Sequence, residues 1–351
     1  MIISQTPCRI SFVGGGSDYP DYWRNYGPAK FISMGISSYV WVIINYNEYS
    51  RIPNVKLNFL DTFEEKNLLS DIENEYVRAA LIVSGFSSRP QNMYIWVRSD
   101  VPLGSGLGSS SAISVGLLRC FNQSYNLNEL FEASLRMEIC TMNKPIGWQD
   151  QLACVFGGFA SYTINSSGEV TRFSIGEGYA NWLLKHIVLF YIPGQVSHEP
   201  RAGITNFDAV FTYIKEQTNL VDMFLSSVMS HNIKEVGRIL DEAWKLKILS
   251  HSSATEDMIE LYNYCMSLGA IGGKFTGSLI GGTHLLLIVD DPDKRIMIAD
   301  ALALRNIKRV HFGLSEIGST LYSVGFGVSR SFTVNIPKIS SIRVGEECWK
   351  K

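Results

Sequence analysis

Several patterns that would assign this chain to a class at once are absent. Its 351 residues contain six cysteines but no C-x-x-C pair, and six histidines but no H-x-x-x-H or H-x-H spacing. A disulfide framework and a structural zinc site are therefore not expected. The scattered cysteines are typical of small core residues in a reducing compartment.

Long apolar runs and an excess of one charge are also absent. The longest apolar runs, such as "HLLLIV" at 284–289, are far shorter than the roughly 20 residues of a membrane span. The net charge is −2, from 31 basic and 33 acidic residues, and no basic, apolar leader begins the chain. We expect a cytoplasmic protein without nucleic-acid or membrane partners, in which local geometry holds any bound anion.

Strands and helices are both expected, and their order is mixed rather than alternating. The expected strands span residues 33–45, 92–100, 159–164, 186–192 and 284–290. The expected helices start at Ser111, after an N-cap at Asn128 and near Trp148, with two more over 205–249 and one over 255–268. This order favours an α+β fold over a doubly wound sheet, with domains over 1–190 and 191–351.

The stretch "DVPLGSGLGSSSA", residues 100–112, lies between an expected strand and an expected helix. Glycines let a backbone adopt positive φ and expose its N–H groups, and a helix N-terminus attracts anions. The loop therefore suits a polyphosphate, with serine hydroxyls near its Mg²⁺; a plain loop with a serine N-cap is the alternative. Neither G-x-x-x-x-G-K-[ST] nor G-x-G-x-x-G fits, because no lysine follows the last glycine and the glycine spacing differs.

Two further segments carry candidate reactive groups. "TPCRISFVGGGSDYPDYW", residues 6–23, places Arg9 before a short strand and Asp18 after three glycines. "PIGWQDQLACVFGGF", residues 145–159, places Asp150 in the first turn of a helix. A carboxylate at that position stays ionised and can accept a proton.

Together these segments resemble the GHMP kinases. "PLGSGLGSSSA" matches the family's phosphate loop, P-x-x-x-G-L-G-S-S-x-A, and "CRISFVGGGSDY" resembles its first motif. The R-[IL]-S-F-x-G-G-G-[ST]-D and P-I-G-x-Q-D-Q patterns are closest to the bacterial D-glycero-D-manno-heptose 7-phosphate kinases. The resemblance is specific over residues 6–160 and looser to about 290.

The resemblance implies a fold and a reaction. The N-terminal, ATP-binding half would resemble the second domain of ribosomal protein S5, the C-terminal half would be ferredoxin-like, and the active site would lie between them. ATP and Mg²⁺ would phosphorylate the anomeric hydroxyl of heptose 7-phosphate. Another sugar (fucose, galactose or a uronic acid) and a catalytically weak paralogue that binds nucleotide or sugar are alternatives. The sequence is compatible with a homodimer.

The resemblance also implies roles for individual residues. Asp150 would be the catalytic base and Arg9 would lie beside it, while Glu138, twelve residues before Asp150, would bind Mg²⁺ with Ser110. The nucleotide-binding positions would be Pro102, Gly104, Ser105, Gly106, Leu107, Gly108, Ser109, Ser110 and Ser111. The sugar would contact Gly15, Gly16, Ser17, Asp18, Asp150 and Gly277. Ordinary roles in helix capping, turns and surface ion pairs are the alternatives.

The third family motif, close to K-x-[ST]-G-[AS]-G-G-G-G, is altered in this chain. Residues 274–282 have the sequence "KFTGSLIGG", with Leu279 and Ile280 where glycines are expected. We expect this bulk to narrow the site or to move the loop. A phosphate on the substrate would need a cationic anchor, for which Arg201, Arg51 and Lys30 are candidates; a solvated surface cation is the alternative.

Overall fold

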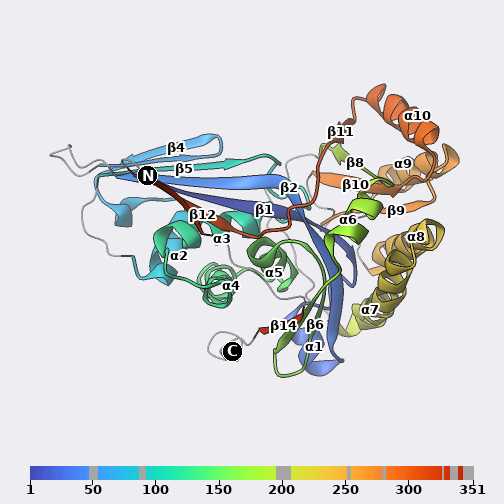
Figure 1. The fold of residues 1–351 in the computed structure, drawn as a ribbon, viewed down its shortest axis with the longest axis horizontal. Helices are drawn as coiled ribbons and strands as arrows, with labels where there is room; N and C mark the ends of the chain where they lie inside the picture. The colour runs from blue at the N-terminus through green and yellow to red at the C-terminus, as the bar shows by residue number, and fades with distance from the viewer. Residues whose placement is uncertain are drawn as a thin grey trace.

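The computed structural model describes residues 1–46, 54–86, 92–194, 207–250, 254–277, 279, 282–325, 328–332 and 339–342. The described strands form two sheets, one of ten strands and one of four (Figure 1). None of the described helices is long and apolar enough to span a membrane.

The ten-stranded sheet combines strands from both ends of the chain. Its strands are β1 (Ile2–Val13), β2 (Ala29–Tyr46), β3 (Val55–Phe59), β4 (Thr62–Lys66), β5 (Met93–Ser99), β6 (Phe159–Ile164), β7 (Val170–Ser174), β12 (Thr320–Gly325), β13 (Val328–Phe332) and β14 (Ile339–Ile342). The long strand β2 pairs with β1 along most of its length, with β5 through residues 40–46 and with β6 through residues 29–34. It therefore joins the two ends of this sheet.

Helices cover one face of this sheet, the lower face in Figure 1. They are α2 (Glu75–Ser84), α3 (Ser109–Phe121), α4 (Leu127–Leu135) and α5 (Gln149–Phe156), with short turns α1 (Pro20–Asn25) and η1 (Leu69–Asp71) and the π-helical turn η2 (Arg136–Thr141). Helix α3 is buried on nearly all sides because its residues are small or apolar. The Ser4 hydroxyl of β1 donates to the Gly116 carbonyl of α3, which fixes the helix against the sheet.

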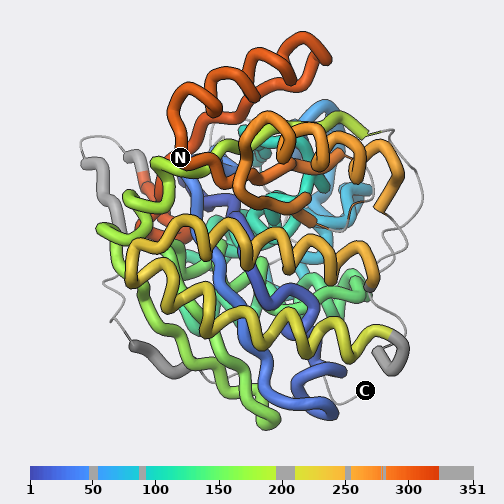
Figure 2. The backbone as a smooth tube through the Cα atoms, turned by 90° about the vertical axis from the view of Figure 1, so that its right-hand side faces the viewer, coloured from blue at the N-terminus to red at the C-terminus, as the bar shows by residue number. Residues whose placement is uncertain are grey.

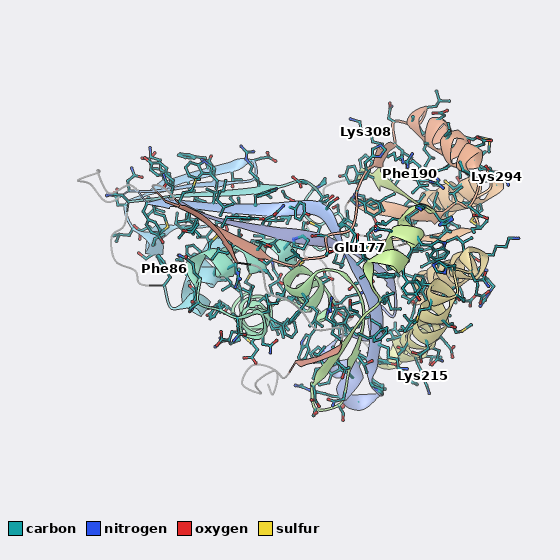
Figure 3. The ribbon with its side chains drawn as sticks, viewed as in Figure 1. Phe86, Glu177, Phe190, Lys215, Lys294 and Lys308 are labelled. Atoms are coloured by element: carbon teal, nitrogen blue, oxygen red, sulfur yellow. The ribbon has the colours of Figure 1, made fainter. Side chains whose placement is uncertain are left out.

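The second sheet has the strand order β11-β8-β10-β9 and is antiparallel throughout. Its elements are β8 (Ile187–Ile192), β9 (Gly272–Phe275), β10 (Thr283–Ile288) and β11 (Lys308–Val310), with helices α6 (Glu177–Leu184), α7 (Phe207–Met229), α8 (Ile233–Ser250), α9 (Glu256–Ser267) and α10 (Pro292–Ala303). From β8 the chain runs strand, helices, strand, strand, helix, strand, which is the ferredoxin-like order. Helices α7 and α8 lie side by side in Figure 2, and Lys215 of α7 and Lys294 of α10 lie on the outer side in Figure 3.

Aromatic contacts pack the helical layer of the second half onto the first sheet. The ring of Phe12 in β1 lies 5.3 Å from Phe224 of α7 and 5.6 Å from Phe159 of β6. A second apolar cluster contains Phe190 of β8 and Trp244 of α8, between the second sheet and its helices. The division at residue 190 stays a prediction: that position lies within β8, and β12 to β14 pair in the first sheet.

The structure confirms the α+β class and most of the expected elements, and it moves two helix starts. Helix α3 begins at Ser109 rather than Ser111, and Arg9 lies within β1 rather than before a strand. The N-cap of α4 is Asn126, not Asn128, because the Asn126 side chain accepts hydrogen bonds from the backbone of Asn128 and Glu129. The Glu129 carboxylate in turn accepts from the Asn126 N–H, which completes a capping box. The glycine-rich stretch at 272–282 also begins as strand β9.

Replacement of Phe224 by alanine tests the packing between the two halves. Phe224 is completely buried, so its removal leaves a cavity against Phe12. The free energy of unfolding should fall by about 3 to 5 kcal/mol, measured by urea denaturation. The control is Phe63→Ala on β4, whose residue is 57% exposed and whose effect should stay within about 0.5 kcal/mol. Equal effects of both variants would contradict this packing.

Candidate active site

The glycine- and serine-rich loop ends in the first turn of α3 with its backbone donors exposed. Gly104, Gly106 and Gly108 have φ angles of 78°, 86° and 75°, which side chains rarely adopt. In the described part of the chain, the backbone N–H groups of residues 106–111 donate to no protein acceptor. These donors and the helix dipole make the loop suitable for an anion.

Two serines stabilise the loop itself. The hydroxyls of Ser105 and Ser109 both donate to the Pro102 carbonyl, at 2.8 and 3.2 Å, and the Gly104 N–H donates to the Ser109 oxygen. Their side chains are therefore used inside the loop. The hydroxyl of Ser110, in contrast, accepts a hydrogen bond from the Tyr76 hydroxyl at 3.1 Å.

One buried guanidinium connects Asp150 with this loop. Arg9 donates from Nε to Asp150 Oδ1 at 2.8 Å, and its Nη2 lies 2.6 Å from the same oxygen. Its Nη1 donates to the Gly106 carbonyl at 2.7 Å. The side chain of Asp150 is 32% exposed, and within the described residues Oδ2 accepts no hydrogen bond. One carboxylate oxygen therefore stays accessible beside the loop.

Glu138 lies in the π-helical turn η2, a rare geometry that is frequent at functional sites. It is 1% exposed, and burial raises the pKa of its carboxyl above the ordinary value, although the charge of Lys144 and hydrogen bonds from Ser111 and Gln151 oppose this shift. Gln151 Nε2 donates to Glu138 Oε2 at 2.5 Å. The Ser111 hydroxyl bonds to Glu138, and the Ser110 hydroxyl accepts from Tyr76. Ser110 as the hydroxyl of the metal site stays a prediction.

These oxygen atoms fit a magnesium ion. Among the described residues, no group of three or more His, Cys, Asp or Glu side chains could hold a metal on its own. Mg²⁺ however is usually bound by one or two carboxylates together with substrate phosphates and water. The buried Oε1 of Gln151 has no hydrogen-bond partner in the described part of the chain. A cation or a hydrogen-bond donor beside Glu138 would give this oxygen a partner.

The first glycine segment meets the start of α5. Asp18 accepts from the Gly16 N–H at 3.2 Å through Oδ1 and from the Gln149 N–H at 3.0 Å through Oδ2. Burial raises the pKa of Asp18 to about 6, and the negative charge of Asp150 adds to the shift. The Ser17 hydroxyl donates to the Gly14 carbonyl at 2.7 Å. Asp18 thus bonds to the first turn of α5, where Asp150 lies, and its contact with the sugar stays a prediction.

The third glycine loop packs directly on the phosphate loop. A Cβ on Gly277 would lie 2.4 Å from the Gly106 Cα, so only glycine permits this approach. Lys247 of α8 donates to the carbonyls of Gly277 and, at 2.9 Å, of Phe275. Burial and the charge of Lys274 lower the pKa of Lys247 well below its ordinary value. The second half of the chain therefore completes the site.

Two more side chains fix the same junction. Lys274 Nζ donates to the Phe12 carbonyl at 2.8 Å, and burial, with the charge of Arg9, lowers its pKa to about 7. His284 of β10 places Nδ1 2.8 Å from the Ser105 carbonyl, and burial lowers its pKa. The neutral ring therefore donates this hydrogen bond to the phosphate loop.

Leu279 was expected to narrow the site or to move the loop, and the structure places its side chain in the second apolar cluster. It has a φ of +65°, the left-handed conformation that glycine favours, and it is 4% exposed within the second apolar cluster, which also contains Trp244 and Phe275. Its side chain fills the core rather than the space beside the phosphate loop. Ile280 lies outside the described residues.

The sequence did not locate every group at this site. Lys247 and His284 carry no motif signal and were missed, as were Tyr76 and Lys144. Of the three candidate phosphate anchors, Arg51 and Arg201 lie outside the described residues. The third, Lys30, is ion-paired with Asp222 at 2.6 Å.

Replacement of Asp18 by asparagine tests the burial of this carboxyl through the pH dependence of stability. Because folding raises its pKa from 3.8 to about 6, its contribution to stability is complete below pH 4 and is lost as the pH rises through 6. Between pH 4 and 7 the wild-type free energy of unfolding should therefore fall by about 2 kcal/mol more than that of Asp18→Asn. Urea denaturation at a series of pH values measures the difference; parallel profiles would refute it.

Comparisons with known proteins indicate which family the chain resembles. Residues 74–158 match the model of the GHMP kinases N terminal domain. The chain is 26% identical to D-glycero-alpha-D-manno-heptose 7-phosphate kinase of Campylobacter jejuni over 86% of its length and 93% of the relative. It is 26% identical to a galactokinase of Pyrococcus furiosus over 86% of its length and 92% of the relative.

A solved structure supports the fold. The crystal structure of a D-glycero-D-manno-heptose 1-phosphate kinase from Bacteroides thetaiotaomicron superposes with a TM-score of 0.76 at 20% identity, and the match covers 93% of this chain and 100% of the other. The expectation of a GHMP kinase fold is confirmed. The chain carries a GHMP kinase N-terminal domain and has the GHMP kinase fold.

Proposed function

We propose that this protein is an ATP-dependent kinase that phosphorylates the anomeric hydroxyl of a sugar, and that the sugar is D-glycero-D-manno-heptose 7-phosphate. The observation that carries the proposal is the Arg9 guanidinium, which contacts both the Asp150 carboxylate and the Gly106 carbonyl. A base and a phosphate-binding loop are thereby held at one place. Phosphoryl transfer requires mainly this kind of positioning and charge stabilisation.

The phosphates of ATP would bind at the N-terminus of α3. The unpaired N–H groups of residues 106–111 would donate to phosphate oxygens, and the dipole of α3 would favour their negative charge. The serines that brace the loop, Ser105 and Ser109, keep these donors oriented before the nucleotide binds. Such preorganised donors need no rearrangement during the reaction.

Asp150 would accept the proton of the attacking hydroxyl. The accessible Oδ2 takes the proton while the sugar oxygen forms its bond to the γ-phosphorus and the bond to the ADP oxygen breaks. Arg9 holds the carboxylate through Oδ1, and its positive charge lies beside the transferring group. Asp18, next to Asp150, would contact the sugar hydroxyls with Gly15, Gly16 and Ser17.

Glu138 would hold Mg²⁺ together with a serine hydroxyl and Gln151 Oε1. When bound, the ion neutralises charge on the nucleotide phosphates. Burial raises the pKa of Glu138 despite the nearby charge of Lys144, and so disfavours the charged carboxylate. A cation at this position would stabilise that charged form.

The choice of sugar rests on the comparisons. The Campylobacter relative is named as a heptose 7-phosphate kinase, and the Pyrococcus relative, at equal identity, as a galactokinase. The bacterial heptose kinase patterns over residues 9–18 and 145–151 favour heptose 7-phosphate. Fucose, galactose or a uronic acid is the alternative.

Replacement of Asp150 by asparagine tests the base. The variant should lose roughly 100- to 10,000-fold in kcat while its ATP affinity stays within about threefold of wild type. Asp293→Asn, which alters another acid in the first turn of a helix, is the matched control and should keep full activity. Activity of the Asp150→Asn variant close to that of wild type would show that another group accepts the proton.

Replacement of Glu138 by glutamine tests the metal site. The Mg²⁺ concentration for half-maximal activity should rise by about tenfold or more, since a carboxylate is the preferred protein ligand. Ser111→Ala should shift it more than Ser110→Ala, because the Ser111 hydroxyl bonds to Glu138 and that of Ser110 to Tyr76. Titrations of activity with MgCl₂ measure the order; an unchanged Mg²⁺ dependence in Glu138→Gln would assign it a structural role.

A substrate panel tests the proposed function as a whole. Free heptose, heptose 7-phosphate, galactose, fucose and a uronic acid are assayed for ATP consumption, and NMR identifies the phosphorylated oxygen. We expect heptose 7-phosphate to have the highest kcat/KM and the product to carry phosphate on the anomeric oxygen. Equal values for a free hexose would replace the heptose assignment, and no turnover of any sugar would favour the weak, binding paralogue.

A further inference from the structure

The glycine- and serine-rich loop at residues 100–112 contains no lysine. A lysine from another segment, Lys144, contacts Tyr76, which in turn bonds to the first turn of α3. Helix α3 begins with the sequence Ser-Ser-Ser at 109–111, where nucleotide-binding P-loops carry Lys followed by Ser or Thr. Lys144 lies in the connection between η2 and α5, and its backbone N–H donates to the Glu138 carbonyl at 2.9 Å. This hydrogen bond folds the connection back toward α3.

The ammonium group of Lys144 lies over Tyr76 of α2 and is linked through it to the start of α3. Its Nζ lies 3.9 Å from the centre of the Tyr76 ring, and the hydroxyl of that ring donates to Ser110 Oγ at 3.1 Å. Its charge also acts on the buried carboxylate of Glu138 in η2, to which the Ser111 hydroxyl bonds. One intervening side chain therefore connects Lys144 with each of the serines Ser110 and Ser111.

We infer that Lys144 contacts the β- or γ-phosphate of the bound nucleotide, as the lysine of a P-loop does. The inference rests on the proposed use of ATP. A lysine side chain is flexible, and the Tyr76 ring and the Glu138 carboxylate limit its freedom before the nucleotide arrives. The phosphate oxygens at the N-terminus of α3 then complete the coordination of the ammonium group.

A purely structural role for Lys144 has a different signature. If Lys144 only neutralised Glu138, its loss would alter the response to Mg²⁺ but not the binding of nucleotide without metal. If Lys144 contacts the terminal phosphates directly, its loss would weaken the binding of ADP. The binding of AMP, which lacks those phosphates, would be unaffected. Binding measured in EDTA therefore separates the two roles.

The experiment is isothermal titration calorimetry of ADP, ATP and AMP in EDTA with wild type, Lys144→Met and Lys144→Arg. We expect Lys144→Met to bind ADP and ATP roughly 10- to 100-fold more weakly and AMP within about twofold of wild type. Lys144→Arg, which keeps the charge, should recover part of the loss. Unchanged AMP binding also reports that the variant is folded, and Lys144→Gln replaces Lys144→Met if the latter is not.

Lys56→Met is the matched control. Lys56 also lies over an aromatic ring, Tyr94 at 5.9 Å, and beside a carboxylate, Glu65 at 3.3 Å. It alternates with buried residues of β3 and so lies on the face of the sheet away from α3. This variant should bind all three nucleotides as wild type does.

The outcomes separate the inference about Lys144 from the proposed kinase function on which it rests. Wild-type affinity of Lys144→Met for ADP in EDTA would overturn the contact with Lys144 and leave the kinase proposal standing. A wild-type protein that binds neither ATP nor ADP, with or without Mg²⁺, would overturn both. Equal weakening of ADP and AMP would also overturn the contact, because it would show a general disturbance of the nucleotide site.

Discussion

The active-site geometry depends on one buried guanidinium. The side chain of Arg9, in β1, bonds to Asp150 at the start of α5 and to the Gly106 carbonyl of the glycine-rich loop. Burial of a charged group is costly unless its hydrogen bonds are made, and here two different elements supply the acceptors. Movement of either element would remove part of these hydrogen bonds from a buried charge. Asp150, the proposed base, and the glycine-rich loop, the proposed phosphate site, are therefore fixed with respect to each other.

The second half of the chain holds the glycine-rich loop at residues 100–112 in place from the side opposite Arg9. The backbone of Gly277 lies against Gly106, and the side chains of Lys247 and His284 bond to the carbonyls of the two loops. Both side chains are held with lowered pKa values, because burial disfavours their charged forms. The ferredoxin-like half thus closes the loop junction from the other side.

The sequence predicted the local structure of the candidate site where it lies within short motifs. The glycine-rich loop before a helix, Asp150 in the first turn of a helix and the α+β class each follow from local patterns of glycine, serine and apolar residues. The roles of these residues stay predictions. Tyr76, Lys144 and Lys247 could not be found in this way, because tertiary contacts alone bring them to the site. A wrong N-cap at Asn128 had a local cause: the capping box at Asn126 begins two residues earlier. For Leu279, the sequence predicted bulk in the site, and the fold placed the side chain in the core.

A double-mutant cycle on kcat with Arg9→Met and Asp150→Asn tests the central claim most directly, since it measures the coupling between the guanidinium and the base. If Arg9 acts by positioning the base, its loss should matter little once the base is absent. The account predicts that the double variant is within about threefold of Asp150→Asn alone, although Arg9→Met by itself lowers kcat by roughly 100-fold or more. Additive losses would show that the two side chains act independently, which contradicts the account.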